Sequence, residues 1–255
     1  MTDESAGEPA PSRRLFRIAG EDRESFLQGL VTNDVAKLRD GLVYAALLGP
    51  QGRYLADFLL VPAGDAILMD VDQNLAEALP RRLSMYRLRA RVTIEPADIA
   101  VTRGLGPAPE GAFADPRHPS LGWRRYGAPC TAAQRIDWDA IRVAATIPQS
   151  AVELVPDETL ILEAGFERLH GVDFRKGCYV GQEVTARMKH KTELRKGLVT
   201  LAIDGEAPVG SAITADGKPA GTLFTRSGGR AIAQLRLDRA GGDLRAGAAR
   251  LQFTG

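Results

Sequence analysis

Three apolar runs separated by two tight turns, all within residues 43–71, place the strongest constraint on how this chain folds. The first turn is Gly49-Pro50-Gln51-Gly52 and the second is Ala63-Gly64-Asp65. Short glycine-containing turns between apolar runs favour antiparallel hairpins, because glycine adopts backbone angles that other residues avoid. The pattern therefore predicts strands, joined as hairpins, over residues 43–48, 54–61 and 66–71.

A helix is expected directly after these hairpins. Asp72 is the expected N-cap of a helix from about residue 75 to about residue 89, with Pro80 in its first turns. A strand is expected at residues 91–94, and another at residues 15–18 precedes the hairpins. Strands on both sides of a helix indicate an α+β fold rather than a doubly wound parallel sheet.

The second half of the chain changes pattern twice. Residues 104–129 are rich in glycine, proline and alanine, which predicts a loop or a connection between domains. A helix is expected from about residue 137, with Trp138 in its first turn. After Lys196, short strands alternate with turns that contain glycine and aspartate, a spacing typical of a small β-barrel. The expected barrel strands are residues 198–203, 211–214, 221–225 and 231–235.

The overall composition argues against several classes of protein. The formal net charge is +1 over 255 residues, so bulk charge gives no reason to expect a protein that coats nucleic acid or membranes. No apolar run reaches the length that a bilayer-spanning helix needs. Residues 1–12 are acidic, contain proline and lack a signal-peptide pattern, so we expect a disordered tail on a cytoplasmic protein.

The cysteines and histidines do not follow a metal-binding pattern. Cys130 and Cys178 lie far apart, and His118, His170 and His190 match none of the common ligand spacings. We therefore expect no metal site and no disulfide. If the protein meets an iron–sulfur cluster, it cannot supply a complete set of ligands by itself.

Cys178 is the residue most open to a chemical role. Gly177 and Gly181 bracket it, and residues 182–189 are compatible with a short helix that would begin just after the cysteine. Helix N-termini and nearby cations favour a thiolate. This stretch is basic through Arg175, Lys176, Arg187, Lys189, Lys191, Arg195 and Lys196. A lone cysteine can equally be a buried small hydrophobe, so the residues alone leave both interpretations open.

The segment around Cys178 resembles the signature of the YgfZ-type family, whose members are folate-binding relatives of the glycine-cleavage T-protein, an aminomethyltransferase. The signature residues around the cysteine are Lys176, Gly177, Tyr179, Gly181, Gln182, Glu183 and Arg187. Residues 20–34, 48–53 and 86–89 are also similar to this family, and the resemblance runs from about residue 15 to the C-terminus.

The resemblance implies a three-domain, T-protein-like ring around a hole the size of tetrahydrofolate. The implied domains are a discontinuous folate-binding domain (13–48 and 130–196), a ferredoxin-like α+β domain (49–129) and a C-terminal small β-barrel (197–255). The implied cofactor is tetrahydrofolate or a one-carbon derivative. The implied partners are iron–sulfur client proteins, including radical enzymes that thiolate tRNA.

The resemblance also implies which residues contact folate. Trp138 lies where the family has a pterin-contacting tryptophan, and Arg53 and Arg87 are candidates for the glutamate tail. The T-protein pattern has two consecutive aspartates where this chain has Ala56-Asp57, so one carboxylate is missing. Because such an acid would handle the proton in one-carbon transfer, its loss puts aminomethyl transfer in doubt. Trp138 can equally be a core or surface-anchored aromatic, and Asp57 can be a satisfied polar residue at the solvent face of a strand.

Three functional hypotheses follow. The leading hypothesis is a folate-binding factor that supports assembly or repair of iron–sulfur enzymes through a reactive Cys178. The alternative is a folate-dependent aminomethyl- or methyltransferase that uses Asp57, and the sequence leaves open whether the protein is an enzyme. Direct tRNA binding is not expected, because the basic stretch lacks interleaved aromatic residues, and no membrane partner is expected.

Overall fold

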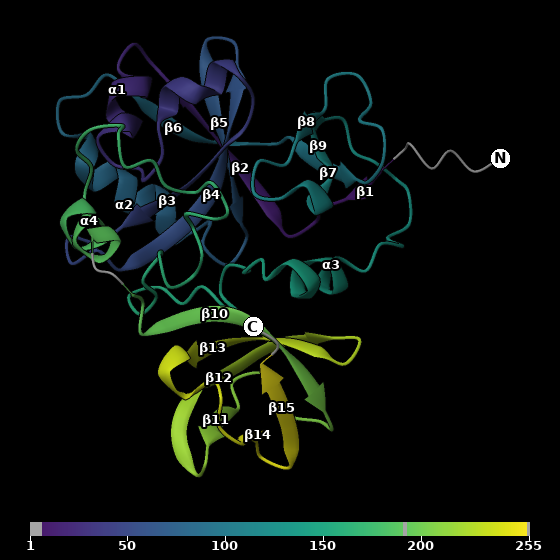
Figure 1. The fold of residues 1–255 in the computed structure, drawn as a ribbon. Helices are drawn as coiled ribbons and strands as arrows, with labels where there is room; N and C mark the ends of the chain where they lie inside the picture. The colour runs from purple at the N-terminus through teal and green to yellow at the C-terminus, as the bar shows by residue number, and fades with distance from the viewer. Residues whose placement is uncertain (1–6, 191–192, 254–255) are drawn as a thin grey trace.

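A computed structural model describes residues 7–190 and 193–253, which form two open sheets and a closed barrel (Figure 1). The largest open sheet is antiparallel and has the strand order β3-β4-β5-β2-β6. Its strands are β3 (Val43–Leu48), β4 (Tyr54–Ala63), β5 (Ala66–Asp72), β2 (Arg13–Ala19) and β6 (Thr93–Ala97). The two predicted hairpins are therefore confirmed, and the strand predicted at residues 91–94 begins two residues later.

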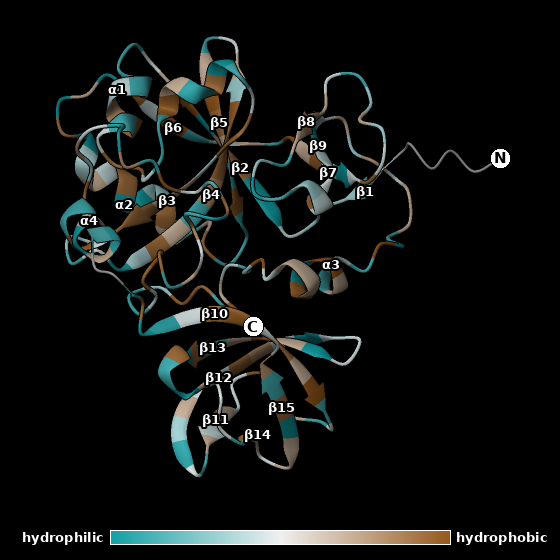
Figure 2. Cartoon of the chain, in the orientation of Figure 1, coloured by the Kyte–Doolittle hydropathy of each residue, from teal (hydrophilic) through white to brown (hydrophobic). Residues whose placement is uncertain are grey.

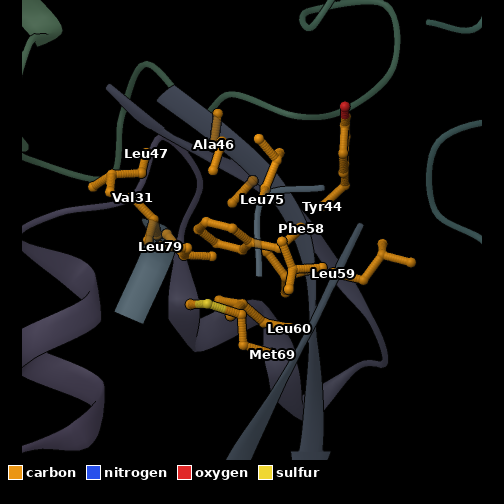
Figure 3. Close-up of a cluster of buried hydrophobic side chains, with 14 of the residues drawn as sticks. Val31, Tyr44, Ala46, Leu47, Phe58, Leu59, Leu60, Met69, Leu75 and Leu79 are labelled. Atoms are coloured by element: carbon orange, nitrogen blue, oxygen red, sulfur yellow. The ribbon is translucent and has the colours of Figure 1, made fainter. Parts of the chain in front are cut away.

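Both faces of this sheet are covered, which explains the nearly continuous apolar runs. Every residue of β3 is buried, as are the first eight residues of β4. The helical segments that go with this sheet are α1 (Arg23–Gln28), η1 (Val35–Arg39) and α2 (Ala78–Arg87). Figure 3 shows Phe58, Leu60, Met69 and Leu79 in the resulting apolar cluster, and the Tyr44 hydroxyl points away from it.

The helix after β5 begins later than the sequence predicts. Asp72 does not cap it, because its carboxylate accepts the backbone N–H of Asn74 at 3.0 Å and so closes a local turn. The helix itself starts at Ala78, with Pro80 in the first turn, where proline is tolerated.

The second open sheet occupies a region that was expected to be a loop. Its order is β1-β7-β9-β8, with bounds Glu8–Pro9, Ala100–Gly104, Trp123–Gly127 and Phe113–Ala114. Trp123 is buried against Gly104, where an added Cβ would lie 2.4 Å from the indole ring. Gly104 is thus needed for close packing, whereas its sequence neighbourhood indicated only a turn.

The N-terminal segment also differs from the expected disordered tail. Residues 1–6 lie outside the described residues, but Glu8–Pro9 pairs with β7 and Glu8 is buried. One Glu8 carboxylate oxygen accepts the backbone N–H groups of Arg135 (2.7 Å) and Ile136 (3.1 Å), and the other accepts the indole N–H of Trp138. These hydrogen bonds attach the N-terminal segment to residues that lie more than a hundred positions further along the chain.

A six-stranded closed barrel ends the fold, as the sequence predicts in outline. Its order is β10 (Lys196–Asp204), β13 (Arg230–Arg236), β12 (Lys218–Ser227), β11 (Ala212–Ala215), β14 (Leu244–Ala246) and β15 (Ala249–Phe253). The sequence analysis missed β14, which has three residues, and β15, which has five. Closure removes the free sheet edges, and Figure 2 shows apolar strand segments in the barrel.

Helix α3 (Trp138–Ala145) connects the open sheets to the barrel. Asp137 caps it by accepting the backbone N–H of Ala140 at 2.8 Å, and the helix contacts β10, β12 and β13. The buried Glu153 carboxylate binds Arg142 from α3 (3.2 Å) and the hydroxyl of Thr225 from β12 (2.5 Å). A buried ion pair with extra hydrogen bonds therefore fixes the barrel to the rest of the molecule.

The largest sheet crosses the expected boundary at residues 48–49, and the two open sheets divide the expected 49–129 domain between them. Strand β3 ends at residue 48 but pairs with β4 beyond it, so residues 13–48 and 49–72 form one sheet. Residues 100–127 belong to the second sheet. The expected boundary at residues 196–197 lies at the start of β10.

Candidate functional site

The Cys178 side chain is exposed, on a loop that rests against the β3–β4 turn. Gly181, at φ +80°, approaches this turn so closely that an added Cβ would lie 2.4 Å from the Gly49 carbonyl oxygen. Tyr179, Val180 and Gly181 separate the cysteine from α4 (Gln182–His190). The helix begins at Gln182, as the sequence predicts, and Cys178 lies just before it, separated from it by this glycine-dependent contact.

Lys176 fixes the loop from its other side. Its ammonium group donates to the carbonyl oxygen of Val31 at 2.7 Å and also to that of Gln28, and the Gln28 side chain donates back to the Lys176 carbonyl at 3.1 Å. Burial lowers the pKa of Lys176 to about 8, although Asp34, Asp173 and Cys178 partly oppose the shift. This lysine stabilises the end of α1 and the loop, and is not free to bind an external anion.

Two further signature residues have local structural contacts. The Gln182 side chain accepts the backbone N–H of Tyr179 at 2.9 Å, and Lys176 lies 4.9 Å from the Tyr179 ring. Glu183 and Arg187 are exposed on α4. The loop is thus anchored by its neighbours, and it presents an exposed thiol beside a basic helix.

A cavity of about 160 Å³ lies where the two open sheets meet α3. Asp57 and Trp138, two residues expected to contact folate, both line it. The other lining residues are Ser12, Arg13, Asp72, Arg103, Asp115, Arg117, Leu121, Arg124, Asp139, Arg142, Pro148, Gln149 and Ser150. Cys178 is not among them, so the structure separates the thiol from the cavity.

Asp57 is buried and accepts three hydroxyl hydrogen bonds. Tyr54 and Ser150 both donate to one carboxylate oxygen at 2.6 Å, and Tyr44 donates to the other at 3.0 Å. Burial, followed by the charge of Asp57, raises the pKa values of Tyr44 and Tyr54 well above their ordinary value. Both phenols therefore stay protonated and keep donating. Asp57 is a satisfied acid inside the protein and does not lie on a solvent face.

Trp138 is also largely committed to contacts within the protein. Its indole N–H donates to Glu8, and the Arg103 guanidinium carbon lies 4.1 Å from the centre of its ring. Arg103 therefore covers one face of the tryptophan on which a pterin would have to stack.

A chain of buried ion pairs forms the back of the cavity. Asp70 accepts from Arg13 at 2.6 Å and from Arg124 at 3.3 Å, and Asp115 accepts from Arg124 at 2.8 Å. Asp115 also receives two hydrogen bonds from Arg117, at 2.9 and 2.7 Å. Burial alone would raise the pKa of Asp115, but these two arginines hold it well below its usual range.

The two arginines expected to hold a glutamate tail lie elsewhere. Arg53 donates to the Glu158 carbonyl and lines a separate groove of about 580 Å³ next to the barrel. Arg87 is exposed at the end of α2. The sequence analysis missed the arginines of the cavity, because they come from distant strands and loops and share no local motif.

The cavity matches tetrahydrofolate only in part. Cavities that enclose drug-sized molecules usually measure about 300–1,000 Å³ and are mostly apolar. This cavity is about 160 Å³ and is lined by five arginines and four aspartates. It has neither the volume for a whole tetrahydrofolate nor, at Asp57, a carboxylate free of hydrogen bonds for proton transfer.

Within residues 7–190 and 193–253, no group of three or more histidine, cysteine, aspartate or glutamate side chains is arranged to hold a metal ion. In the same residues, no helix combines the length and the apolar character that crossing a membrane requires.

The fold is that of the glycine-cleavage T-protein. The crystal structure of glycine cleavage system aminomethyltransferase T from Bartonella henselae matches 94% of this chain and 82% of that protein, with a TM-score of 0.73. The two sequences are only 13% identical, so this similarity defines the architecture and not the activity. Residues 195–254 match the C-terminal β-barrel domain of CAF17.

Sequence relatives define the family within this fold. The mouse and human iron–sulfur cluster assembly factors IBA57 are 30% and 31% identical to this chain, and each match covers 91% of this chain and 78% of the relative. A homologue from Mycosarcoma maydis is 32% identical, with 75% of this chain and 56% of the relative covered. The chain belongs to the IBA57 family of iron–sulfur cluster assembly factors.

These relatives contradict one expectation. The sequence analysis expected a cytoplasmic protein, whereas the mouse, human and fungal relatives are mitochondrial proteins. The expectation rested on the absence of a signal pattern in residues 1–12, and a property of so few residues is weak support for a location.

Proposed function

We propose that this chain supports the assembly or repair of iron–sulfur proteins through Cys178. The observation that carries the proposal is an exposed thiol on a loop fixed at both ends, by Lys176 on one side and Gly181 on the other. Membership of a family of iron–sulfur cluster assembly factors supports the same role.

The residues limit what Cys178 can do with a cluster. Iron–sulfur clusters are commonly held by four cysteine thiolates, and Cys178 is the only cysteine on this loop. A partner or client protein must therefore supply the remaining ligands. In this proposal Cys178 loses its proton and provides one ligand to a cluster that is cargo, while the basic helix α4 attracts an acidic partner surface.

Transfer of a cluster to an apo iron–sulfur enzyme tests this role. We expect Cys178→Ser to lower the rate of enzyme reactivation by about tenfold or more, because serine is a poor ligand for iron in a cluster. Cys130→Ser is the matched control, since Cys130 is the chain's other cysteine and should leave the rate unchanged. Equal rates for Cys178→Ser and the wild type would refute the proposal.

The identity of the clients is a finer part of the proposal. Radical enzymes that thiolate tRNA are candidate clients, because they depend on iron–sulfur clusters. Cells in which Cys178→Ala replaces the wild type should lose thiolated tRNA while the amount of this protein stays constant. Unchanged tRNA thiolation would remove these enzymes from the clients.

Tetrahydrofolate is a second candidate ligand, favoured by the joint position of Asp57 and Trp138 in the cavity wall. The bicyclic end of the molecule is the part that so small a cavity could receive. Titration with tetrahydrofolate, repeated with Trp138→Leu, tests binding. Turnover with an aminomethyl-lipoyl carrier that survives Cys178→Ala but not Asp57→Asn would instead favour the folate-dependent transferase.

A further inference from the structure

Arg103 differs from the other four arginines that line the cavity. Arg13, Arg117, Arg124 and Arg142 each form at least one ion pair at 3.3 Å or less. Within residues 7–190 and 193–253, the Arg103 side chain forms no hydrogen bond and no ion pair. Its guanidinium group stacks on the ring of Trp138. The charge of Glu8 partly compensates this half-buried guanidinium, but its buried Nε–H group has no acceptor, and a donor that has lost water without gaining an acceptor is unfavourable.

The register of the second sheet makes this isolation more costly. Arg103 on β7 lies directly opposite Arg124 on β9, and like charges at such positions repel each other. On its other side Arg103 lies opposite Glu8, but the Glu8 carboxylate already accepts three N–H groups. Neither neighbouring strand therefore supplies Arg103 with an acceptor.

Orphaned donors point to the same place. The Nε–H groups of Arg103 and Arg142 are both buried without an acceptor, and both residues line this cavity. Burial first, and then the charge of Arg124, lowers the pKa of Arg103 to about 10, although the charge of Glu8 partly opposes the shift, so the guanidinium is still charged at neutral pH. The cavity thus has a positive group, unfilled donors and a volume suited to a small molecule.

We propose that this cavity binds an oxyanion group, a carboxylate or a phosphate, through Arg103. A guanidinium group binds a carboxylate or a phosphate through two parallel hydrogen bonds. The bound oxyanion would thus supply acceptors for N–H groups that have none within the protein. The oxyanion comes either from a small free anion or from a carboxylate that a larger ligand inserts into the cavity. The site uses no atom of Cys178, so it is a function beyond cluster support.

Calorimetric titration with inorganic phosphate and with malonate, at an ionic strength held constant with chloride, tests the proposal. We expect saturable binding to the wild type and a loss of affinity of about tenfold or more in Arg103→Met. Arg125→Met is the matched control: Arg125 neighbours Arg124 on β9, so its side chain projects from the opposite face of the sheet. This control and Cys178→Ser should both bind like the wild type.

A second variant of Arg103 tests the role of its guanidinium group, and two competing ligands distinguish the possible sources of the oxyanion. Arg103→Lys retains the charge without the fork, so an intermediate affinity would support the proposal even if Arg103→Met fails to fold. Competition by tetrahydrofolate but not by tetrahydropterin, which lacks the glutamate, would identify the carboxylate of a larger ligand as the source. Competition by neither would identify a small free anion. Absence of saturable binding, or equal affinity in Arg103→Met, would overturn the proposal.

Discussion

The Cys178 loop and the central cavity show opposite arrangements of polar side chains. In the loop, the Cys178 thiol is exposed while its neighbour Lys176 is bound to backbone carbonyl oxygens. In the cavity, the acid at the position expected for catalysis, Asp57, is buried and accepts three hydroxyl hydrogen bonds. The motif residues of the loop hold one exposed thiol in place, whereas most charged groups of the cavity are bound to other groups of the protein.

This difference separates fold from function. The chain shares the architecture of an aminomethyltransferase, yet an acid whose oxygens are filled by hydroxyl groups is poorly placed to take up a proton. The exposed thiol lies outside the cavity altogether. A shared architecture therefore does not imply a shared activity, because the buried polar groups of this cavity stabilise the fold.

The largest expected effect lies in the buried ion pairs behind the cavity. Asp70→Asn should destabilise the fold by about 3–5 kcal/mol, because Arg13 and Arg124 would keep their charges without this shared partner. Urea unfolding measures the loss. The control is Asp65→Asn, which removes an exposed ion pair with Arg17 and should cost less than about 1 kcal/mol. Similar losses of unfolding free energy in the two variants would contradict the view that the buried ion pairs stabilise the fold more than the exposed pair does.

Asp57→Asn should have a smaller effect of about 1–3 kcal/mol, because three hydroxyl donors lose a charged acceptor inside the protein. Cluster transfer by the folded variant should match the wild type, since Asp57 and Cys178 lie in separate sites. A variant of normal stability that fails in cluster transfer would show that the two regions act together.

The next effect concerns pH and the loop. The unfolded chain holds the Lys176 proton up to its ordinary pKa of 10.5, whereas the folded protein releases it near pH 8. Between these values the unfolded state binds more protons, so raising the pH stabilises the fold. Relative to Lys176→Met, the wild-type melting temperature should therefore rise by roughly 2 °C between pH 8 and 10. The exposed Lys218→Met serves as the control, and a flat difference would contradict the burial of this lysine.

The smallest effect on stability is expected at Cys178 itself. Cys178→Ser should change the free energy of unfolding by no more than about 0.5 kcal/mol, because the side chain is exposed. The same variant is expected to show the large loss in cluster transfer. A strong destabilisation would mean that the cysteine has a packing role and would weaken the comparison between the loop and the cavity.

Local patterns predicted the hairpins, four of the six barrel strands and the start of α3 at Trp138. They failed for the second sheet, where Gly104 and Trp123 pack together across a segment that looks like a loop. They also failed for Glu8, whose acidic, proline-containing surroundings gave no sign that it would be buried. In these cases a distant contact overrode a local preference.

By itself, the sequence determined the features that depend on neighbouring residues. Glycine turns fixed the hairpins, and the Lys-Gly-Cys motif marked the loop of Cys178, because turn chemistry acts over a few residues. Only the tertiary structure decided which charges meet. Arg13 and Asp70 are 57 residues apart, and they pair because β2 and β5 lie side by side. Among the residues that the structure describes, Arg103 has no hydrogen-bonded ion pair for the same reason, since sheet register, and not local sequence, determines its neighbours.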